Sequence, residues 1–372
     1  MKPPLRVLHV FAVLDRGGAE SRTMDIYRKI DKTKVQFDFV AYKNDYAYAF
    51  EEEIQNLGGR VYHMPRYKAS GHFTFRRAWK QLLKNHPEWS VIHVHNTSTA
   101  VFWIGIAKKL KRKVIAHSRT AGGTLDRVSI SKVLMRYPLR YKADYLFAVS
   151  EKAAQWMFGK YGSQTTIIRN AIDVNTFAFN LETRNRKRHE LGLNDNNFII
   201  GHVGRFVPEK KHDFIVDIFA EIIKLAPDSI LLFVGDGFLR EEISDKVKTL
   251  SLTDNVIFAG ERADVAGFLQ AMDIFLFPSL FEGMPGAVIE AQAAGLNCLI
   301  SDTITDEVRI TDLVESLSLS LTADVWANKA VELLNEKTCR DTKYLIKAAG
   351  FDVIDVAEQL CMFYDEIDTY KN

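Results

Sequence analysis

Short apolar runs alternate with longer segments of helical period along most of the chain, and this alternation restricts its fold more than any other feature. The short runs are rich in Val, Ile and Phe, and in the segments between them apolar residues recur about every 3.6 positions. This pattern indicates repeated βαβ units. We expect strands at 5–14, 37–42, 91–95, 114–117 and 145–149, then at 198–203, 230–234, 256–259, 274–277 and 298–300. The predicted fold class is therefore α/β, with two Rossmann-like parallel sheets.

The domain organisation follows from length and from one polar stretch. At 372 residues the chain is long for a single domain, and residues 180–197 are polar, charged and free of strand signal. We expect an amino-terminal domain over 1–180, a carboxy-terminal domain over 181–352 and a central cleft between them. Residues 353–372 have amphipathic helical period, and we expect this terminal helix to pack back toward the amino-terminal domain.

The cellular location is predicted from what the sequence lacks. The first residues do not have the form of a signal peptide, and no later window approaches the apolar length of a membrane-spanning helix. The three cysteines, Cys298, Cys339 and Cys361, have no metal-ligand spacing and lie in or beside apolar runs. Buried thiols of this kind suit a reducing compartment, so we expect a cytoplasmic protein.

The near-neutral total charge hides an asymmetry. Residues 1–180 hold 30 Lys and Arg against 14 Asp and Glu, whereas residues 181–372 hold 19 against 33. A basic half favours an anionic neighbour, and no nucleic-acid-binding signature is present. We therefore expect contact with the anionic inner face of a membrane through residues 75–84, 108–113 and 127–142, where Trp, Leu and Met lie among cations. The alternative is a solvated basic face with its Leu and Trp turned into the core.

A glycine pair follows the first predicted strand. Gly17 and Gly18 lie between Asp15-Arg16 and the start of a predicted helix, where backbone without side chains can approach a diphosphate closely. A tight strand-to-helix turn that binds no ligand explains the same residues.

Two cations five positions apart follow the first strand of the second half. Arg205 and Lys210 lie on a loop after a strand end, the position that faces the ligand crevice of an open parallel sheet. A guanidinium and an ammonium stabilise the charge that develops on a departing diphosphate. A solvated basic loop is the alternative, and for the neighbouring Lys211 it is the interpretation we prefer.

Two glutamates flank a loop rich in Gly and Pro near residue 285. Glu290 lies on an otherwise apolar helix, where a carboxylate is costly unless it is paired, so it can serve the hydroxyl groups of a ribose. Glu282 precedes this helix and would face a sugar, and the backbone amides of Gly283 to Gly286 would add donors at the helix start. A carboxylate satisfied by nearby backbone is the alternative for Glu290.

Taken in order, these segments resemble the retaining GT-B glycosyltransferases of family 4, the group that includes capsular and exopolysaccharide transferases. The resemblance covers nearly the whole chain. It rests on an ordered set of short motifs: GGAE at 17–20, VIHVH at 91–95, AHSR at 116–119, RNAID at 169–173, GR at 204–205 with EK at 209–210, GDG at 235–237, and the segment 282–290.

The resemblance implies a role for each matching residue. His117 looks like the family's active-site histidine near the donor sugar and the acceptor hydroxyl, although a lone histidine is more often structural. The expected catalytic residues are Arg205, Lys210, Glu282 and His117. The expected donor-binding residues are Gly17, Gly18, Arg205, Lys210, Gly235, Gly237, Glu282, Gly283, Met284, Pro285, Gly286 and Glu290.

The expected chemistry needs no metal or other cofactor. No Asp-x-Asp pair occurs to hold a divalent ion on the diphosphate, and His93 and His95 share one strand without a third ligand of suitable spacing. We assign these two histidines to structure or to acceptor contact. Pro208 and the Asn170-Ala171 pair depart from the family pattern and leave the local loop geometry open.

The predicted function is retaining transfer of a sugar from a nucleotide-diphosphate donor to an acceptor hydroxyl, with a UDP-sugar and a lipid-linked glycan favoured by analogy. An oxidoreductase is disfavoured because the first turn lacks Gly-x-Gly-x-x-Gly. A sugar-nucleotide epimerase of the same two-domain shape remains an alternative. So does an anion-binding protein without enzymatic activity, but that hypothesis leaves the second-half Arg, Lys and Glu residues without a role.

Overall fold

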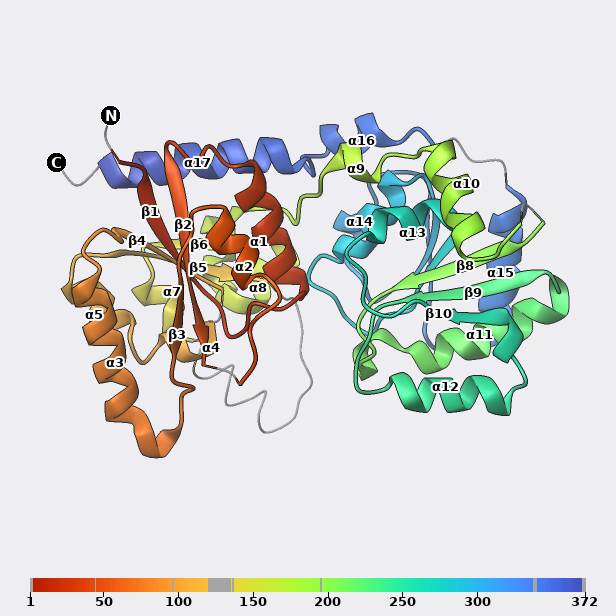
Figure 1. Ribbon diagram of the computed structural model, residues 1–372, viewed down its shortest axis with the longest axis horizontal. Coiled ribbons are helices and arrows are strands. Elements are labelled where there is room, and N and C mark those ends of the chain that lie inside the picture. The colour runs from red at the N-terminus through yellow and green to blue at the C-terminus, as the bar shows by residue number, and fades with distance from the viewer. Residues whose placement is uncertain are drawn as a thin grey trace. The chain divides into compact units, whose positions relative to one another are not determined.

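The computed structural model describes residues 3–43, 45–95, 97–119, 135, 137–194, 196–336 and 340–369. The chain forms two compact units (Figure 1). Unit 1 contains Met1–Ala171 and Val353–Asn372, and unit 2 contains Ile172–Asp352. The division therefore falls after Ala171, whereas the sequence led us to expect it at residue 180.

Unit 1 is built on a seven-stranded sheet in which all neighbouring strands are parallel. Its spatial order is β3 (Val61–Met64), β2 (Val35–Tyr42), β1 (Leu5–Val10), β4 (Val91–Val94), β5 (Lys113–Ser118), β6 (Tyr145–Ala148) and β7 (Thr166–Ile167). Parallel neighbours require crossover connections, and the helical segments between the apolar runs supply them.

Helices cover both faces of this sheet. On one face α1 (Gly18–Lys29), α2 (Glu51–Asn56) and α17 (Val353–Thr369) pack around Val7, Phe37 and Phe39. On the other face lie α3 (His72–Asn85), α4 (Thr97–Ala100), α5 (Ile104–Lys109), α7 (Leu139–Lys142) and α8 (Glu151–Phe158). Ser150 caps α8 by accepting a hydrogen bond from the Ala153 amide at 3.1 Å, as its position before an acidic first turn predicts.

The last helix belongs to unit 1 although the chain reaches it through unit 2. In Figure 1, α17 runs along the sheet beside α1. Its apolar residues Val353, Val356, Leu360, Tyr364 and Ile367 are buried in the same cluster as the strands β1 and β2. The amphipathic spacing of this segment in the sequence therefore corresponds to a helix face that packs on the core.

Unit 2 repeats the architecture with six parallel strands. Their order is β10 (Val256–Phe258), β9 (Ser229–Val234), β8 (Phe198–Val203), β11 (Ile274–Phe277), β12 (Asn297–Ser301) and β13 (Val314–Leu317). The helices are α9 (Val174–Phe177), α10 (Leu181–Glu190), α11 (His212–Leu225), α12 (Arg240–Thr249), α13 (Val265–Ala271), α14 (Gly286–Ala293), α15 (Ala323–Asn335) and α16 (Lys343–Ala348). The predicted α/β class is confirmed.

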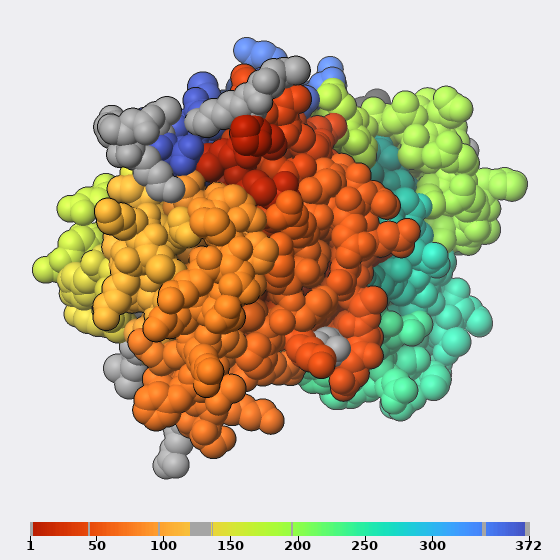
Figure 2. Space-filling model, turned by 60° about the vertical axis from the view of Figure 1, so that its left-hand side comes forward, coloured from red at the N-terminus to blue at the C-terminus, as the bar shows by residue number. Residues whose placement is uncertain are grey.

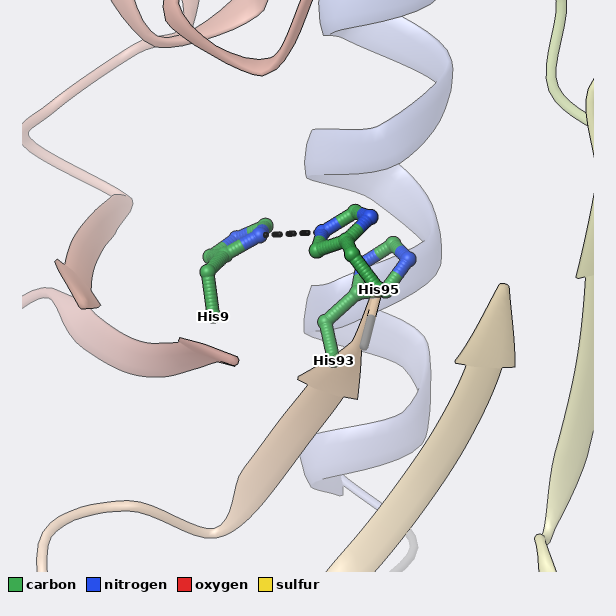
Figure 3. Close-up of side chains that lie close together, drawn as sticks. All are labelled: His9, His93 and His95. Atoms are coloured by element: carbon green, nitrogen blue, oxygen red, sulfur yellow. Dashed lines mark hydrogen bonds between the residues drawn. The ribbon is translucent and has the colours of Figure 1, made fainter. Parts of the chain in front are cut away.

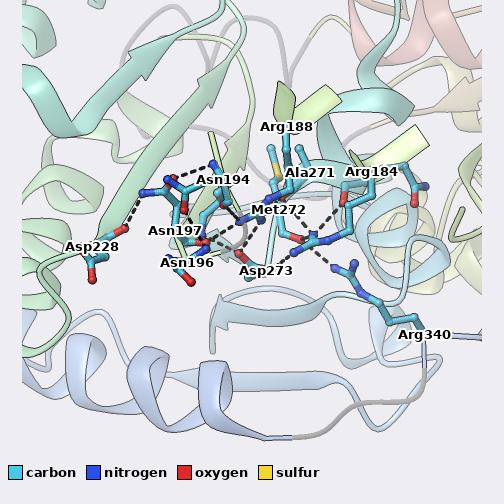
Figure 4. Close-up of polar contacts among 12 residues, drawn as sticks. Arg184, Arg188, Asn194, Asn196, Asn197, Asp228, Ala271, Met272, Asp273 and Arg340 are labelled. Atoms are coloured by element: carbon cyan, nitrogen blue, oxygen red, sulfur yellow. Dashed lines mark hydrogen bonds and ion pairs between the residues drawn. The ribbon is translucent and has the colours of Figure 1, made fainter. Parts of the chain in front are cut away.

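The polar stretch after residue 180 forms helix α10. Its arginines donate hydrogen bonds to the turn after α13 in the same unit (Figure 4). Arg184 donates to the carbonyl groups of residues 270–272 at 3.0, 3.2 and 2.8 Å and pairs with Asp273 at 2.5 Å. Arg188 and Arg340 donate to the same turn, at 3.1 Å to Ala271 and 2.8 Å to Met272. Three guanidinium groups thus cap the carbonyl end of α13, which explains why so charged a segment is ordered.

The basic amino-terminal half does not expose all the apolar residues that we expected beside its cations. Phe75, Trp79 and Leu83 of α3 are buried, and Trp79 stacks on Trp103 with ring centroids 4.1 Å apart. The part of the membrane argument that used these residues is therefore wrong, because they fill the core. Most of the basic stretch 127–142 lies outside the described residues. Among the residues that the structure describes, no helix is long and apolar enough to cross a membrane.

Candidate functional site

Each sheet has one point where its connections turn in opposite directions, between β1 and β4 in unit 1 and between β8 and β11 in unit 2. Loops that leave the carboxyl ends of such strands diverge, and open α/β sheets bind ligands in the resulting crevice. Three candidate residues follow these strands, namely Gly17 after β1, Arg205 after β8 and Glu282 after β11. His117 lies near the carboxyl end of β5, which pairs with β4.

The loop that carries Arg205 is held by two glycines after β9. A Cβ atom on Gly235, whose φ is +136°, would lie 2.1 Å from the Gly204 carbonyl oxygen. A Cβ atom on Gly237 would lie 2.6 Å from the Phe206 carbonyl oxygen. Backbone hydrogen bonds of 3.0 Å from Gly204 to Val234 and from Phe206 to Asp236 complete the contact. Both glycines, which we expect to bind the donor, therefore allow the loop at residues 204–206 to lie close to the segment after β9.

Arg205 itself is exposed, and none of the described residues accepts a hydrogen bond from its guanidinium. Lys210 lies at the end of a short 3-10 helix, Pro208–Lys210, and forms an ion pair with Glu282 across the two strand ends. Its ammonium also lies 4.5 Å from the centre of the Phe277 ring. Pro208, a departure from the family pattern, occupies the first helical position, where a missing N–H costs nothing.

The Glu290 side chain lies on α14 and is 6% exposed. Helix α14 begins at Gly286 after Pro285, which provides no side-chain cap, so its first amide groups have no partner within the helix. Gly283, Met284 and Pro285 are buried in the turn between Glu282 and the helix. This segment therefore places Glu282 before a buried turn and Glu290 within the helix that follows it.

In unit 1, Gly17 and Gly18 form the start of α1. Gly17 is the residue before the helix and Gly18 its first residue, and a Cβ atom on Gly18 would meet nothing within 4 Å. A Cβ on Gly17 would lie 2.3 Å from Glu20 Oε2, the flexible end of a side chain that can move. The turn is sterically open at Gly18, which fits close approach of a ligand to the backbone.

Four histidines gather inside unit 1, three of which appear in Figure 3. His93 Nε2 lies 2.9 Å from His117 Nδ1, and His9 Nδ1 lies 3.1 Å from His95 Nε2. One ring nitrogen each from His9, His93 and His95 falls within a 4.8 Å group that could hold a metal ion. Our statement that His93 and His95 lack a third ligand was therefore wrong. The sheet order brings in His9, which is paired in register with His93.

Arg119 is a site residue that we did not single out from the sequence. It follows β5 and donates to His95 Nδ1 at 3.2 Å, to Asn170 Oδ1 at 3.1 Å and to Thr23 Oγ1 at 3.2 Å. Arg119 follows a strand end, as Arg205 does in unit 2. The signal that we used for Arg205 could therefore also have identified Arg119. Arg119 thus links β4, β5, α1 and the segment after β7.

Burial keeps these histidines neutral. It lowers the pKa of His9 to about 3, and the charge of Arg119 adds to the effect. Burial likewise holds the pKa values of His93, His95 and His117 well below the ordinary 6.5. Burial lowers the pKa of Arg119 to about 10, so at neutral pH one guanidinium cation faces four neutral rings.

Comparison with known proteins decides the family. A model described as Glycosyltransferase Family 4 matches residues 16–176, and one described as Glycosyl transferases group 1 matches residues 183–348. EpsF of Bacillus subtilis (strain 168), named as a glycosyltransferase, is 35% identical over 333 residues, which are 87% of this chain and 86% of EpsF. The chain belongs to glycosyltransferase family 4.

Two further relatives of this family 4 enzyme act, by their names, on bacterial glycans. The capsular polysaccharide biosynthesis glycosyltransferase CapH of Staphylococcus aureus is 26% identical over 90% of this chain and 92% of its own. A UDP-Gal:alpha-D-GlcNAc-diphosphoundecaprenol alpha-1,3-galactosyltransferase of Escherichia coli is 32% identical over 176 residues, 46% of each chain. The predicted relation to capsule and polysaccharide transferases is confirmed.

A solved structure confirms the GT-B fold of this family 4 enzyme. HepE of Anabaena, in complex with UDP and glucose, superimposes with a TM-score of 0.80 and covers 97% of this chain and all of its own, at 18% identity. The two Rossmann-like parallel-sheet domains were predicted from the sequence.

Proposed function

We propose that this glycosyltransferase moves a sugar from a UDP-sugar to a hydroxyl group of a lipid-linked glycan, with retention of the anomeric configuration. The observation that carries the proposal is a set of charged side chains on the loops after β8 and β11: the exposed Arg205 and, on the same loop, Lys210, which pairs with Glu282. It offers two cations to a diphosphate and one carboxylate to sugar hydroxyl groups.

The ion pair of Lys210 with Glu282 brings a cation and a carboxylate together between the ends of the two strands. A diphosphate bound there would accept hydrogen bonds from Lys210 and from the exposed Arg205. Glu282 would then accept hydrogen bonds from the hydroxyl groups of the attached sugar. The family resemblance implies the same roles for these three residues.

The reaction follows from this charge distribution. The bond between the anomeric carbon and the diphosphate oxygen breaks, and Arg205 and Lys210 stabilise the negative charge that the diphosphate gains. The acceptor hydroxyl attacks from the face that the diphosphate leaves, and its proton passes to a phosphate oxygen. The family resemblance assigns His117 to the donor sugar and the acceptor, and Gly17 and Gly18 to the diphosphate. No step uses a metal ion.

The choice of a UDP-sugar rests on relatives. HepE was solved with UDP and glucose, and the E. coli relative is named for UDP-Gal. On this chain the buried carboxylate of Glu290 suits the two hydroxyl groups of a ribose, because a carboxylate accepts two hydrogen bonds side by side. Gly283, Met284, Pro285 and Gly286, which we also expect to bind the donor, form the turn that leads into its helix.

An anionic membrane partner fits one surface of unit 1, the side turned forward in Figure 2. Phe73, at the start of α3, is 86% exposed. Exposed cations continue from it along the same helix face and onto the end of α5, namely Arg77, Lys80, Lys84, Lys109 and Lys111. One exposed aromatic ring beside a row of cations suits a headgroup region, where a diphosphate-linked lipid acceptor would reside.

A transfer assay tests the proposal. The full chain is incubated with each of several UDP-sugars, with and without a lipid-diphosphate-linked acceptor, in the presence of EDTA. We expect a new glycosidic product only when the acceptor is present, with the donor's anomeric configuration by NMR. An inverted anomer would reject the retaining mechanism, and an epimerised donor formed without acceptor would establish the epimerase alternative instead.

A further inference from the structure

Six side chains inside unit 1 form two hydrogen-bonded chains that stack on each other. One chain runs from Arg119 to His95 to His9, and the other from Tyr364 of α17 to His93 to His117. The rings of His93 and His95 lie 4.4 Å apart at 18°, which brings the two chains into contact. Figure 3 shows the His9 to His95 contact with His93 beside it.

The direction of the first chain is fixed by the guanidinium. Arg119 Nε always carries a hydrogen, so His95 Nδ1 accepts its hydrogen bond. A neutral His95 then carries its own proton on Nε2 and donates it to His9 Nδ1 at 3.1 Å. His9 therefore holds its proton on Nε2. One obligatory donor thus decides the tautomers of two histidines.

The direction of the second chain is fixed by a tyrosine. Burial raises the pKa of Tyr364, so its hydroxyl keeps its proton, and His93 Nδ1 lies 2.6 Å from the oxygen. If His93 carried a proton on Nδ1, the tyrosine oxygen would accept it, and the tyrosine O–H would have no acceptor among the described residues, which costs about 1–3 kcal/mol. The opposite direction leaves the unpartnered donor on His117 at the strand end, where a substrate oxygen can accept its hydrogen bond. Tyr364 therefore donates to His93 Nδ1.

The tautomer of His93 in turn determines the tautomer of His117. His93 carries its proton on Nε2 and donates it to His117 Nδ1 at 2.9 Å. His117 is left with its proton on Nε2, an atom that is buried and for which none of the described residues supplies a hydrogen-bond partner. At the carboxyl end of β5, His117 thus offers an N–H group and not a lone pair.

The same hydrogen-bond assignments argue against a metal ion bound by His9, His93 and His95. The lone pairs of His95 Nδ1, His9 Nδ1 and His93 Nδ1 each accept a hydrogen bond already, and the Arg119 cation lies 3.2 Å from one of the rings. A divalent ion would have to displace these donors and face the guanidinium charge in a buried place.

We propose that Tyr364 is a positioning residue for sugar transfer, and that through His93 it sets the tautomer in which His117 donates an Nε2 hydrogen bond to a substrate oxygen. This inference rests on the proposed function, which places His117 beside the donor sugar. It deepens that function in one respect, because His117 keeps its proton throughout and is not the base for the acceptor hydroxyl. That proton passes to the departing phosphate oxygen.

The tautomers can be measured without reference to activity. In the full chain labelled with ¹⁵N in the histidine rings, long-range ¹H–¹⁵N spectra distinguish a protonated ring nitrogen from a bare one. We expect His117 of the wild type to carry its proton on Nε2 alone. Tyr364→Phe removes the deciding donor, so both His117 tautomers should become populated.

A matched control separates this effect from loss of a buried hydroxyl group. Tyr27 lies in the same core cluster as Tyr364, and its hydroxyl donates to Gln36 at 2.5 Å, away from the histidines. Tyr27→Phe should leave the His117 tautomer unchanged. In Tyr364→Phe, kcat should fall in proportion to the measured fraction of His117 that lacks a proton on Nε2. If the two tautomers are equally populated, the fall is about twofold. The UDP affinity of unit 2 should stay constant.

A second pair of variants tests the donor role directly. His117→Gln places an amide N–H near the position of Nε2 and should keep kcat within about tenfold of the wild type, whereas His117→Leu should lower it about 10²-fold, as loss of a transition-state donor does.

The outcomes are separable. A bare His117 Nε2 in an active wild type, an unchanged tautomer in Tyr364→Phe, or tight Zn²⁺ binding that shifts the His9, His93 and His95 resonances would each overturn the inference while sparing the proposed function. Equal losses in the two His117 variants would do the same. Absence of transfer from every UDP-sugar, with the tautomers as assigned, would instead overturn the proposed function.

Discussion

Substituting Gly235 by alanine tests whether the glycines after β9 set the position of Arg205. The added Cβ would lie 2.1 Å from the Gly204 carbonyl oxygen, whereas real Cβ atoms do not approach closer than 3.0 Å. The loop before Arg205 must therefore retreat by roughly 1 Å, a displacement that can lower catalytic efficiency about 10²-fold. The φ of +136° adds backbone strain of about 1–3 kcal/mol.

Two measurements follow from these magnitudes. Strain of that size should lower the melting temperature of unit 2 by about 2–12 °C, since 1 kcal/mol corresponds to about 2–4 °C in a domain of this size. Calorimetry should show UDP binding weakened about tenfold or more, because a charge-assisted hydrogen bond from Arg205 is lost or lengthened. Transfer activity should fall with it.

Gly260→Ala is the matched control. Gly260 also has a positive φ, +74°, and its Cβ would meet nothing within 4 Å, so the substitution adds strain without a collision. It should lower the melting temperature and leave UDP affinity unchanged. Wild-type UDP affinity and turnover in Gly235→Ala would refute the reasoning, and equal loss of UDP binding in both variants would show that strain, not contact with the loop, is responsible.

Four further predictions follow. Arg205→Ala and Lys210→Ala should each lower kcat about 10²-fold with native circular dichroism, and normal turnover would remove that residue from the mechanism. Glu282→Gln should mainly lower kcat, whereas Glu290→Gln should mainly weaken UDP binding; unchanged UDP affinity would show that Glu290 was misassigned. The protein should pellet with anionic but not zwitterionic vesicles in low salt, and charge reversal at Lys109 and Lys111 should weaken this; equal partitioning would contradict it. Lys108 and Arg112 are left intact there, because the first pairs with Asp144 and the second donates to the Pro87 carbonyl at 3.0 Å. Because the folded pKa of His9 is about 3, below the unfolded 6.5, the unfolded chain binds more protons in acid, so stability should fall as the pH drops from 6.5 toward 3. His9 alone costs about 2 kcal/mol at pH 5, and a melting temperature that does not change between pH 7 and 5 would exclude this.

Local pattern was sufficient for the central strands and for the motifs that follow them. Runs such as 274–277 are apolar on both faces because helices cover both sides of a parallel sheet, and this leaves a plain signal in the sequence. The missed strands β3, β7 and β13 lie at or next to the sheet edges, where short mixed sequences such as VYHM and VESL carry little pattern. The charged helix α10 was missed as an element because its partners are backbone carbonyls of a distant turn.

The unit 1 site was less accessible to such reasoning. His9 meets His93 and His95 because β1 and β4 are neighbours, which is a fact of sheet order and not of spacing along the chain. Tyr364 reaches His93 across 271 positions and had been read only as part of an amphipathic helix. Arg119 could have been found, since a cation directly after a strand end was the same signal that identified Arg205.

The return of α17 to unit 1 has a consequence for synthesis on the ribosome. Unit 2 is continuous in sequence and can fold as soon as its last residue emerges, whereas unit 1 waits for Val353 to Ile367 to cover one face of its sheet. At synthesis rates of about 5–20 residues per second, the intervening residues take roughly 10–40 s to make. During that interval Phe37, Phe39 and Tyr27 lack their final cover, so the nascent amino-terminal segment is the stage at which chaperone binding or aggregation would compete with folding.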